Sequence, residues 1–119
     1  MKRAAWLAQQ RGRKAVLYVI RVYSKEEEAF YKVGITYNLA ARFRRIRADY
    51  HWRTLARYSS YRAEHIWNLE QAIHRDFAHL SYSPAASFSG HTECYAEVKA
   101  ILAALPAGTF FLKPVNCDI

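Results

Sequence analysis

The sequence predicts a small α/β domain in which a three-stranded, mostly antiparallel sheet is flanked by helices. Residues with high strand propensity, β-branched and aromatic, gather in three runs at about 15–23, 30–36 and 53–61. Apolar residues recur at helical spacing in three further segments, at about 38–49, 62–80 and 92–105. With 119 residues, the chain has the length of one domain that buries a single core.

The first two strands should form a hairpin. The charged run from Ser24 to Glu28 separates them and has the length of a hairpin loop, so antiparallel pairing is expected. Alternation places Tyr18 on one face of the first strand and Lys32 on one face of the second. If those faces coincide, a phenol and an ammonium lie side by side. Gly34, inside the second run, indicates a bulge or a close approach by another backbone or a ligand.

An arginine interrupts the apolar stripe of the helix predicted at 38–49. Asn38 is a suitable N-cap, and Leu39, Phe43 and Ile46 form the inward stripe. Arg42 falls inside that stripe when successive residues are placed about 100° apart. Its guanidinium either snorkels or pairs within the structure, or it neutralises a bound anion, for which a substrate phosphate is the best match.

A carboxylate lies at the edge of the apolar face of the helix predicted at 62–80. Glu70 borders this face, and His74 follows one turn later on the same side. Two interpretations stay open. Glu70 is an i, i+4 partner of His74 at the rim of the core, or it holds a hard divalent cation.

The charge of the chain indicates a polyanionic partner. The formal net charge is +8 and the sequence pI is about 9.7. Residues 42–62 hold seven arginines and one acidic residue, Asp49. The arginines are Arg42, Arg44, Arg45, Arg47, Arg53, Arg57 and Arg62. The aromatic residues between them either stack on exposed bases or belong to the third strand and the core; they are Tyr50, Trp52, Tyr58 and Tyr61.

Several short motifs occur in an order and at a spacing that resemble the GIY-YIG nuclease superfamily. They are Val16-Leu17-Tyr18, Lys32-Val33-Gly34, Arg42 and Leu69-Glu70-x-x-Ile73. The second motif looks like that of the phage and bacterial branch, whose members read Lys-Ile-Gly-Ile-Thr at this place. The stretch from Gly90 to Tyr95 resembles the Gly-x-Glu-aromatic signature that closes the same branch. The similarity covers roughly residues 15–97.

The chain also departs from the family pattern. Val16 replaces the first-motif glycine and Lys32 the second-motif tyrosine, both of which this branch tolerates. Ile46 stands where many members carry a histidine, and the usual asparagine is missing near Tyr82 to Pro84. Because of these two absences, the details of proton transfer stay open. The alternative of a degenerate enzyme stays open as well.

The resemblance implies a divalent-metal-dependent endonuclease that hydrolyses phosphodiester bonds in DNA, with RNA left open as a substrate. In family terms Glu70 would hold Mg²⁺ or Mn²⁺, and Arg42 would neutralise charge that develops on the scissile phosphate. Tyr18 would orient or deprotonate the attacking water, and Lys32 beside it would tune the phenol. The alternative is a nucleic-acid-binding module on the same fold with little or no catalysis.

Other residues are expected to support this set. Tyr31, Gly34 and His74 would lie beside the catalytic groups, whereas Glu93 either supports them or interacts with a helix dipole. The arginines expected to contact nucleic-acid phosphates are Arg44, Arg45, Arg47, Arg53, Arg57 and Arg62. Sequence specificity would come from the domain's own loops, from a homodimer or from a partner protein.

The chain divides into a basic N-terminal arm at 1–14, a GIY-YIG-like domain at 15–105 and a C-terminal tail at 106–119. In the tail, Phe110 to Leu112 form an added strand or an oligomer contact. Because no stretch approaches the roughly 18 apolar residues of a membrane span and no signal-peptide core is visible, we expect no membrane partner and a cytoplasmic location in a bacterial or phage-infected cell. Cys94 and Cys117 fit neither a disulfide framework nor zinc spacing.

Overall fold

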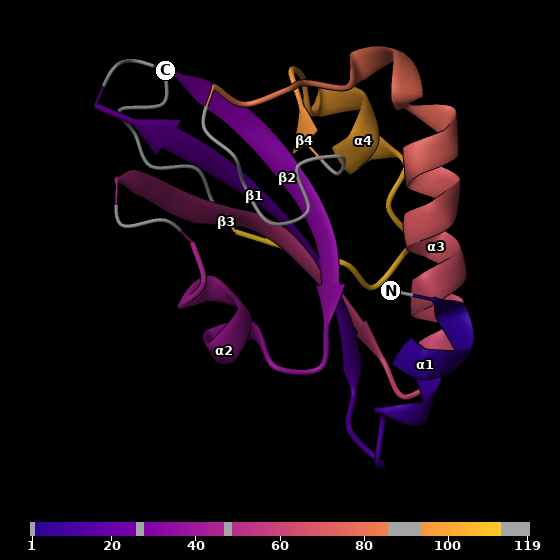
Figure 1. The fold of residues 1–119 in the computed structure, drawn as a ribbon. Coiled ribbons are helices and arrows are strands. Elements are labelled where there is room, and N and C mark those ends of the chain that lie inside the picture. Colours follow the sequence, from indigo (N-terminus) through magenta and orange to yellow (C-terminus); the bar gives the residue numbers. More distant parts are fainter. Residues whose placement is uncertain (1, 26–27, 47–48, 86–93, 113–119) are drawn as a thin grey trace.

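A computed structural model of the chain describes residues 2–25, 28–46, 49–85 and 94–112. Its centre is one antiparallel sheet of five strands in the order β4-β2-β1-β3-β5 (Figure 1). The strands are β1 (Ala15–Ser24), β2 (Ala29–Thr36), β3 (Tyr50–Ser60), β4 (Cys94–Tyr95) and β5 (Phe110–Phe111). The expected α/β class with an antiparallel sheet is confirmed, but the expected number of three strands is wrong.

Helices cover both faces of the sheet. One face carries α3 (Ala63–Asp76), together with α1 (Arg3–Ala8) and α4 (Lys99–Ala103). The opposite face carries α2 (Leu39–Phe43), which stands apart from the other helices in Figure 1. A single 3-10 turn, η1 (Ala78–Leu80), follows α3. None of the helices in the described residues has the length and apolarity that crossing a membrane requires.

Successive side chains of β1 enter two different cores. Leu17 and Val19 pack with Ile66 of α3 on one face, whereas Tyr18 and Ile20 belong to the cluster on the α2 face. Because β1 is also paired on both edges, by β2 and β3, it is buried on every side. This explains why its sequence reads as one apolar run instead of an alternating one.

Two expected helices are shorter than the sequence indicated. The helix expected at 38–49 ends at Phe43, because β3 already pairs with β1 from Tyr50 onward and the chain must reverse direction before that point. The third strand correspondingly begins earlier than expected. The helix expected at 62–80 ends at Asp76 and is followed by the 3-10 turn η1.

The third expected helix, at 92–105, is mostly replaced. Cys94 and Tyr95 pair with β2 opposite Lys32 and Tyr31 and form β4, so helix α4 begins only at Lys99. Residues 92–93 lie outside the described residues. The apolar residues of this segment have helical spacing, but Cys94 and Tyr95 form a strand because the edge of β2 offers them backbone hydrogen bonds.

The register of the β1–β2 hairpin brings the expected residues together. Tyr18 lies opposite Gly34 and Ile20 lies opposite Lys32, so Tyr18 and Lys32 project from the same face as diagonal neighbours. The expected antiparallel hairpin is confirmed. The pairing runs without a shift from Val16 to Tyr23, so the bulge considered for Gly34 is not there.

A bulge lies between β1 and β3 instead. Val19 and Ile20 pair with Ala56 and Thr54, which leaves Leu55 as the extra residue of β3. One consequence concerns the arginines. Arg57 lies opposite Tyr18 and Arg53 lies opposite Arg21, so these two arginines project from opposite faces of the sheet.

Both terminal segments are part of the fold. Trp6 of α1 is buried, stacks on Tyr37 with ring centroids 4.4 Å apart, and lies 5.7 Å from the ring of Trp67 on α3. The Tyr37 hydroxyl donates a hydrogen bond of 2.9 Å to the carbonyl of Trp6. At the other end, Phe110–Phe111 pairs with β3 as β5, which fulfils the added-strand alternative for the tail.

A carboxylate fastens the hairpin loop to its neighbours. The hydroxyls of Tyr50 and Tyr82 donate hydrogen bonds to Glu28, and the backbone amide of Ala85 donates a third of 2.8 Å. These bonds, that of Tyr50 foremost, hold the pKa of Glu28 below its ordinary value. Phe30 and Tyr82 also stack, with centroids 5.3 Å apart. Glu28 therefore joins the β1–β2 loop, the start of β3 and the segment at 82–85.

Glu28→Gln should lower the free energy of unfolding near neutral pH and matter little in acid. Since the folded-state pKa is lowered from 4.5, the stabilisation is present above that value and is lost as the pH falls through the folded pKa. Urea unfolding from about pH 3 to pH 7 should show the two proteins converging toward the acid end. Exposed Glu97 provides the control Glu97→Gln. A pH-independent gap between the Glu28 variant and the parent protein would contradict the assignment.

Candidate active site

Tyr18 and Gly34 form the floor of the candidate site. The phenol ring lies across Gly34 so closely that a Cβ there would come 2.6 Å from Cζ and closer still to the hydroxyl oxygen. No side chain larger than hydrogen fits at position 34 while Tyr18 keeps this place. The close approach expected at Gly34 is therefore made by a side chain of the neighbouring strand.

Helix α2 holds Arg42 against this floor. Asn38 caps the helix, as expected, by accepting a hydrogen bond of 3.1 Å from the amide of Ala41. Arg42 Nε donates a hydrogen bond of 3.0 Å to the hydroxyl oxygen of Tyr18. Phe43 packs edge-on against the same ring, with centroids 5.4 Å apart. Neighbouring residues of one short helix thus fix both the ring and the hydroxyl of Tyr18.

Lys32 is a buried cation of the site, with only 3% of its surface exposed. It lines a small cavity of about 10 Å³ together with Tyr18, Arg42 and Arg45, and no carboxylate is among the residues that line it. This volume is close to the space that one water molecule needs, and the surrounding polar groups can hold such a water.

Glu70 belongs to the opposite wall and is also buried, with 4% of its surface exposed. Its Oε2 lies 3.5 Å from His74 Nε2, yet neither atom makes a hydrogen bond with the described residues. The separation allows an ion pair if His74 is protonated, but the geometry falls short of a hydrogen bond. His74 is fixed on its other side, where Nδ1 bonds the hydroxyl of Tyr95. A buried carboxylate oxygen therefore lacks a donor among the described residues.

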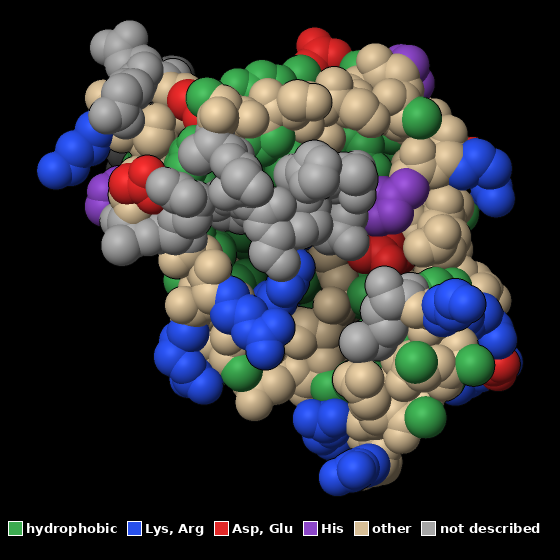
Figure 2. Space-filling view, in the orientation of Figure 1, with side chains coloured by type: hydrophobic (Ala, Val, Ile, Leu, Met, Phe, Trp, Pro, Cys, Tyr) green, Lys and Arg blue, Asp and Glu red, His purple; other side chains and the backbone are tan. Residues whose placement is uncertain are grey.

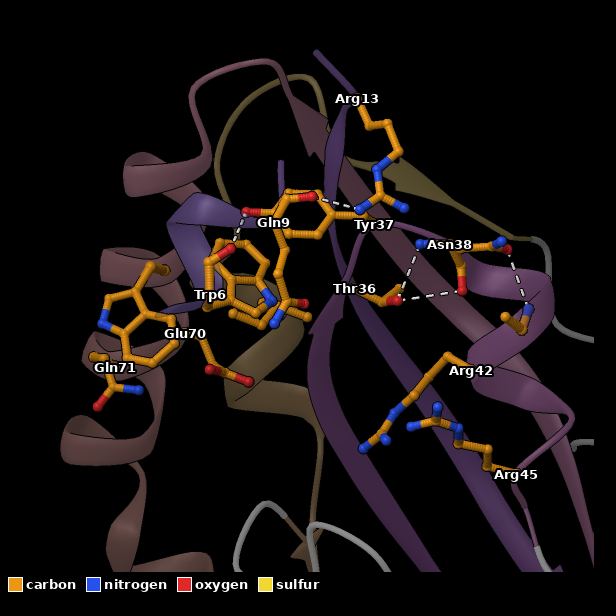
Figure 3. A pocket seen from close by; sticks show the side chains of 13 residues that line it. Trp6, Gln9, Arg13, Thr36, Tyr37, Asn38, Arg42, Arg45, Glu70 and Gln71 are labelled. Atoms are coloured by element: carbon orange, nitrogen blue, oxygen red, sulfur yellow. Dashed lines mark hydrogen bonds between the residues drawn. The ribbon is translucent and has the colours of Figure 1, made fainter. Parts of the chain in front are cut away.

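A cavity of about 520 Å³ joins the two walls. Glu70 and Gln71 of α3 line one side, and Arg42 of α2 and Arg45 of the following turn line the other (Figure 3). In this view the carboxylate of Glu70 and both guanidinium groups point into the same space. The cavity lies beside residues 35–38, at the end of β2 that β4 does not cover, so elements from both faces of the sheet reach it.

Cationic groups outnumber carboxylates around this cavity. Among the described residues, Arg13, Arg42 and Arg45 line it, against one carboxylate, that of Glu70. Figure 2 shows Lys and Arg side chains gathered on the α2 side of the hollow and an acidic group on the α3 side. Such an arrangement suits a phosphodiester held by guanidinium groups, with a carboxylate placed to hold a cation beside it.

The chemistry of this set fits one hydrated Mg²⁺ better than a metal enclosed by protein. The described residues contain no cluster of three or more His, Cys, Asp or Glu side chains that could hold a metal ion. Mg²⁺ usually keeps several waters and is held by one or two carboxylates together with substrate phosphates. Glu70 lines the cavity and can supply such a carboxylate.

The structure brings some of the expected residues together and separates others. Tyr18, Lys32, Arg42 and Arg45 surround the small cavity, and Arg42, Arg45 and Glu70 surround the large one. Tyr31, in contrast, packs with the core on the α3 face and lines a different hollow beside α4. Arg47 and Glu93 lie outside the described residues.

The remaining arginines expected to bind phosphate are dispersed. Arg44 is exposed on the turn after α2 but lines neither cavity, and Arg62 is exposed just before α3. Arg57 is exposed on the Tyr18 face, with its guanidinium 5.1 Å from the ring of Phe110. Arg53 is half-buried on the other face. The cluster seen in the sequence is therefore not one surface.

Sequence reasoning missed the aromatic part of the large cavity. Trp6, Tyr37 and Trp67 line it, together with Gln9 and Arg13 from the N-terminal arm. The available signal was the pair Trp6-Leu7 within a basic arm, which is typical of an anchored segment and not of a frayed end.

These observations describe a small basic α/β domain with an arginine-lined cavity and a buried carboxylate at the edge of its sheet. Residues 15–105 match the family model of the T5orf172 domain, and the chain belongs to that family. The T5orf172 domain is associated with nuclease-like or DNA-binding function. No curated protein and no solved structure matches the chain.

Gly34→Ala should displace the phenol of Tyr18 and lower stability by about 1–3 kcal/mol, the usual cost of overpacking. Denaturant unfolding measures the loss. In a Tyr18→Ala background the added methyl group has room, so the same change should cost little. If Gly34→Ala is equally costly in both backgrounds, contact with Tyr18 is not what requires the glycine.

Proposed function

We propose that this protein is a divalent-metal-dependent endonuclease of the GIY-YIG type that cleaves phosphodiester bonds in DNA. The observation that carries the proposal is the shared cavity, in which Arg42, already bonded to Tyr18, faces the buried Glu70. The family supports a nuclease-like or DNA-binding domain in general, and the motif resemblance supports this particular type.

Arg42 would bind the scissile phosphate. Its Nε is engaged by Tyr18, and a guanidinium carries further N–H donors, which can bond phosphate oxygens from a fixed position. Arg45 lines the same cavity and adds a second cation. Positive charge that is held in place before the reaction stabilises the negative charge that develops on the phosphate in the transition state.

Tyr18 has two roles in this proposal. With 1% of its surface exposed, it mainly positions Arg42. Because its hydroxyl accepts the Arg42 bond, its own proton stays available to bond a water in the adjoining small cavity. Lys32 lines that cavity as well and can hold the same water, so this pair would orient the attacking nucleophile.

Glu70 would hold the metal ion. When bound, Mg²⁺ polarises the phosphate and stabilises the leaving oxygen. The carboxylate is suited to this role because it is buried and faces the cavity. Phosphate binding by itself would gain nothing from a carboxylate at this place, which favours an enzyme over a binding module.

Nicking of a supercoiled plasmid with and without Mg²⁺ tests the proposal. Glu70→Gln should lower the nicking rate about 1,000-fold or more, because a metal contributes several kcal/mol to such reactions. DNA affinity in EDTA should stay equal or rise, since a negative charge near the phosphates is removed. Glu64→Gln, an exposed position on the same helix, should change neither quantity.

Two results would overturn the proposal. The first is full nicking activity in a folded Glu70→Gln protein. The second is a parent protein that binds DNA or RNA but cleaves neither with Mg²⁺ or Mn²⁺. The second result would favour the alternative, a nucleic-acid-binding module on this fold, consistent with Ile46 at a position where many GIY-YIG members carry a histidine.

Arg42→Lys separates geometry from charge. Lysine keeps the positive charge but has no Nε to bond Tyr18 and no guanidinium fork, so we expect a rate at least about 100-fold lower with DNA affinity nearly unchanged. The matched control is Arg44→Lys, on the same turn but outside both cavities, which should leave the rate unaltered. Equal losses in both variants would contradict a specific role for the Arg42 guanidinium.

A further inference from the structure

The N-terminal arm builds a wall of the large cavity, although it lies outside the family match. The match begins at residue 15, whereas Trp6, Gln9 and Arg13 all line the cavity. The T5orf172 core of this chain therefore acquires part of its cavity from a segment that the family model does not include. Such an addition can change which substrate fits.

This wall is a connected series of rings. Arg13 lies over the ring of Tyr37 at 4.9 Å, Tyr37 stacks on Trp6 at 4.4 Å, and Trp6 contacts Trp67 at 5.7 Å. Trp6 is buried and serves as the anchor, whereas Tyr37 and Trp67 are only partly buried where they line the cavity. Aromatic rings beside guanidinium groups form the surface on which unpaired bases stack.

The size of the cavity limits what can enter. A volume of about 520 Å³ falls in the range of pockets that bind one small molecule, so it has room for one nucleotide. Enzymes that enclose a base act on a single strand or extrude the nucleotide from the stack. The side-chain amides of Gln9 and Gln71, which can both donate and accept hydrogen bonds, also line the cavity and suit the edge of a base.

We infer that this cavity binds one unpaired nucleotide next to the scissile phosphate. Its base stacks against the ring of Trp67, while Arg42 and Arg45 hold its phosphate. The preferred substrate is thus DNA with an unpaired nucleotide at the cut, such as a bulge or a single-stranded end. The inference rests on the proposed function for the cut itself, whereas nucleotide binding is measured without cleavage.

Fluorescence anisotropy in EDTA tests the binding step. The probes are one labelled duplex, the same duplex with a single bulged thymidine, and the same duplex with a bulged abasic residue. The parent protein should bind the bulged thymidine about ten-fold or more tightly than the other two. Equal affinity for the thymidine and abasic bulges would overturn the inference, because both carry the same phosphates and only one carries a base.

Variants then locate the base. Trp67→Leu should remove the preference for the thymidine bulge, and Trp67→Phe should restore most of it, because phenylalanine keeps a ring for stacking. Phe111→Leu is the control, since Phe111 is an exposed aromatic residue of β5 that lines neither cavity. If Trp67→Leu fails to fold, the comparison of thymidine and abasic bulges in the parent protein still tests whether the cavity binds a base.

The same probes in Mg²⁺ separate this inference from the proposed function. Preference for the bulged thymidine without any cleavage supports nucleotide binding and contradicts the proposed nuclease function. Cleavage of all duplexes at one rate, with no preference in binding, supports the nuclease and overturns the unpaired-nucleotide site.

Discussion

The contact between the phenol of Tyr18 and the backbone of Gly34 is the constraint on which the rest of the site depends. Gly34 lets the ring lie flat against β2, and the ring then presents its hydroxyl to Nε of Arg42. Helix α2 is only five residues long and too short to be stable alone. Its position comes from the Asn38 cap, the Phe43 contact and this hydrogen bond.

The cavity lies where groups from the two faces of the sheet meet. Residues 35–38, at the end of β2 and just after it, line its middle. Arg42 of α2 reaches this space from one face of the sheet and Glu70 of α3 from the other. Within the described residues, β4 pairs with β2 at Tyr31 and Lys32, away from this end of the strand.

The two buried charged groups of the site lie in different surroundings. Lys32 and Glu70 are both almost completely buried. Lys32 lies with Tyr18, Arg42 and Arg45 around the small cavity on the α2 face. Glu70 lies by His74 at the rim of the α3 face and lines the large cavity. In the proposed function, the arginines would hold the phosphate and Glu70 would hold the metal ion.

The sequence by itself determined the hairpin, its antiparallel pairing, the Asn38 cap and the family motifs, because each depends on neighbours along the chain or on simple alternation. Only the tertiary structure decided the rest. The bulge at Leu55 sends Arg53 and Arg57 to opposite faces, and an open strand edge turns Cys94 and Tyr95 from expected helix into β4. Stacking of Trp6 on Tyr37 joins segments 31 residues apart in sequence, which no local pattern encodes. Contacts between distant segments decided which arginines face the cavity, since the charge of a residue does not determine where it lies in the fold.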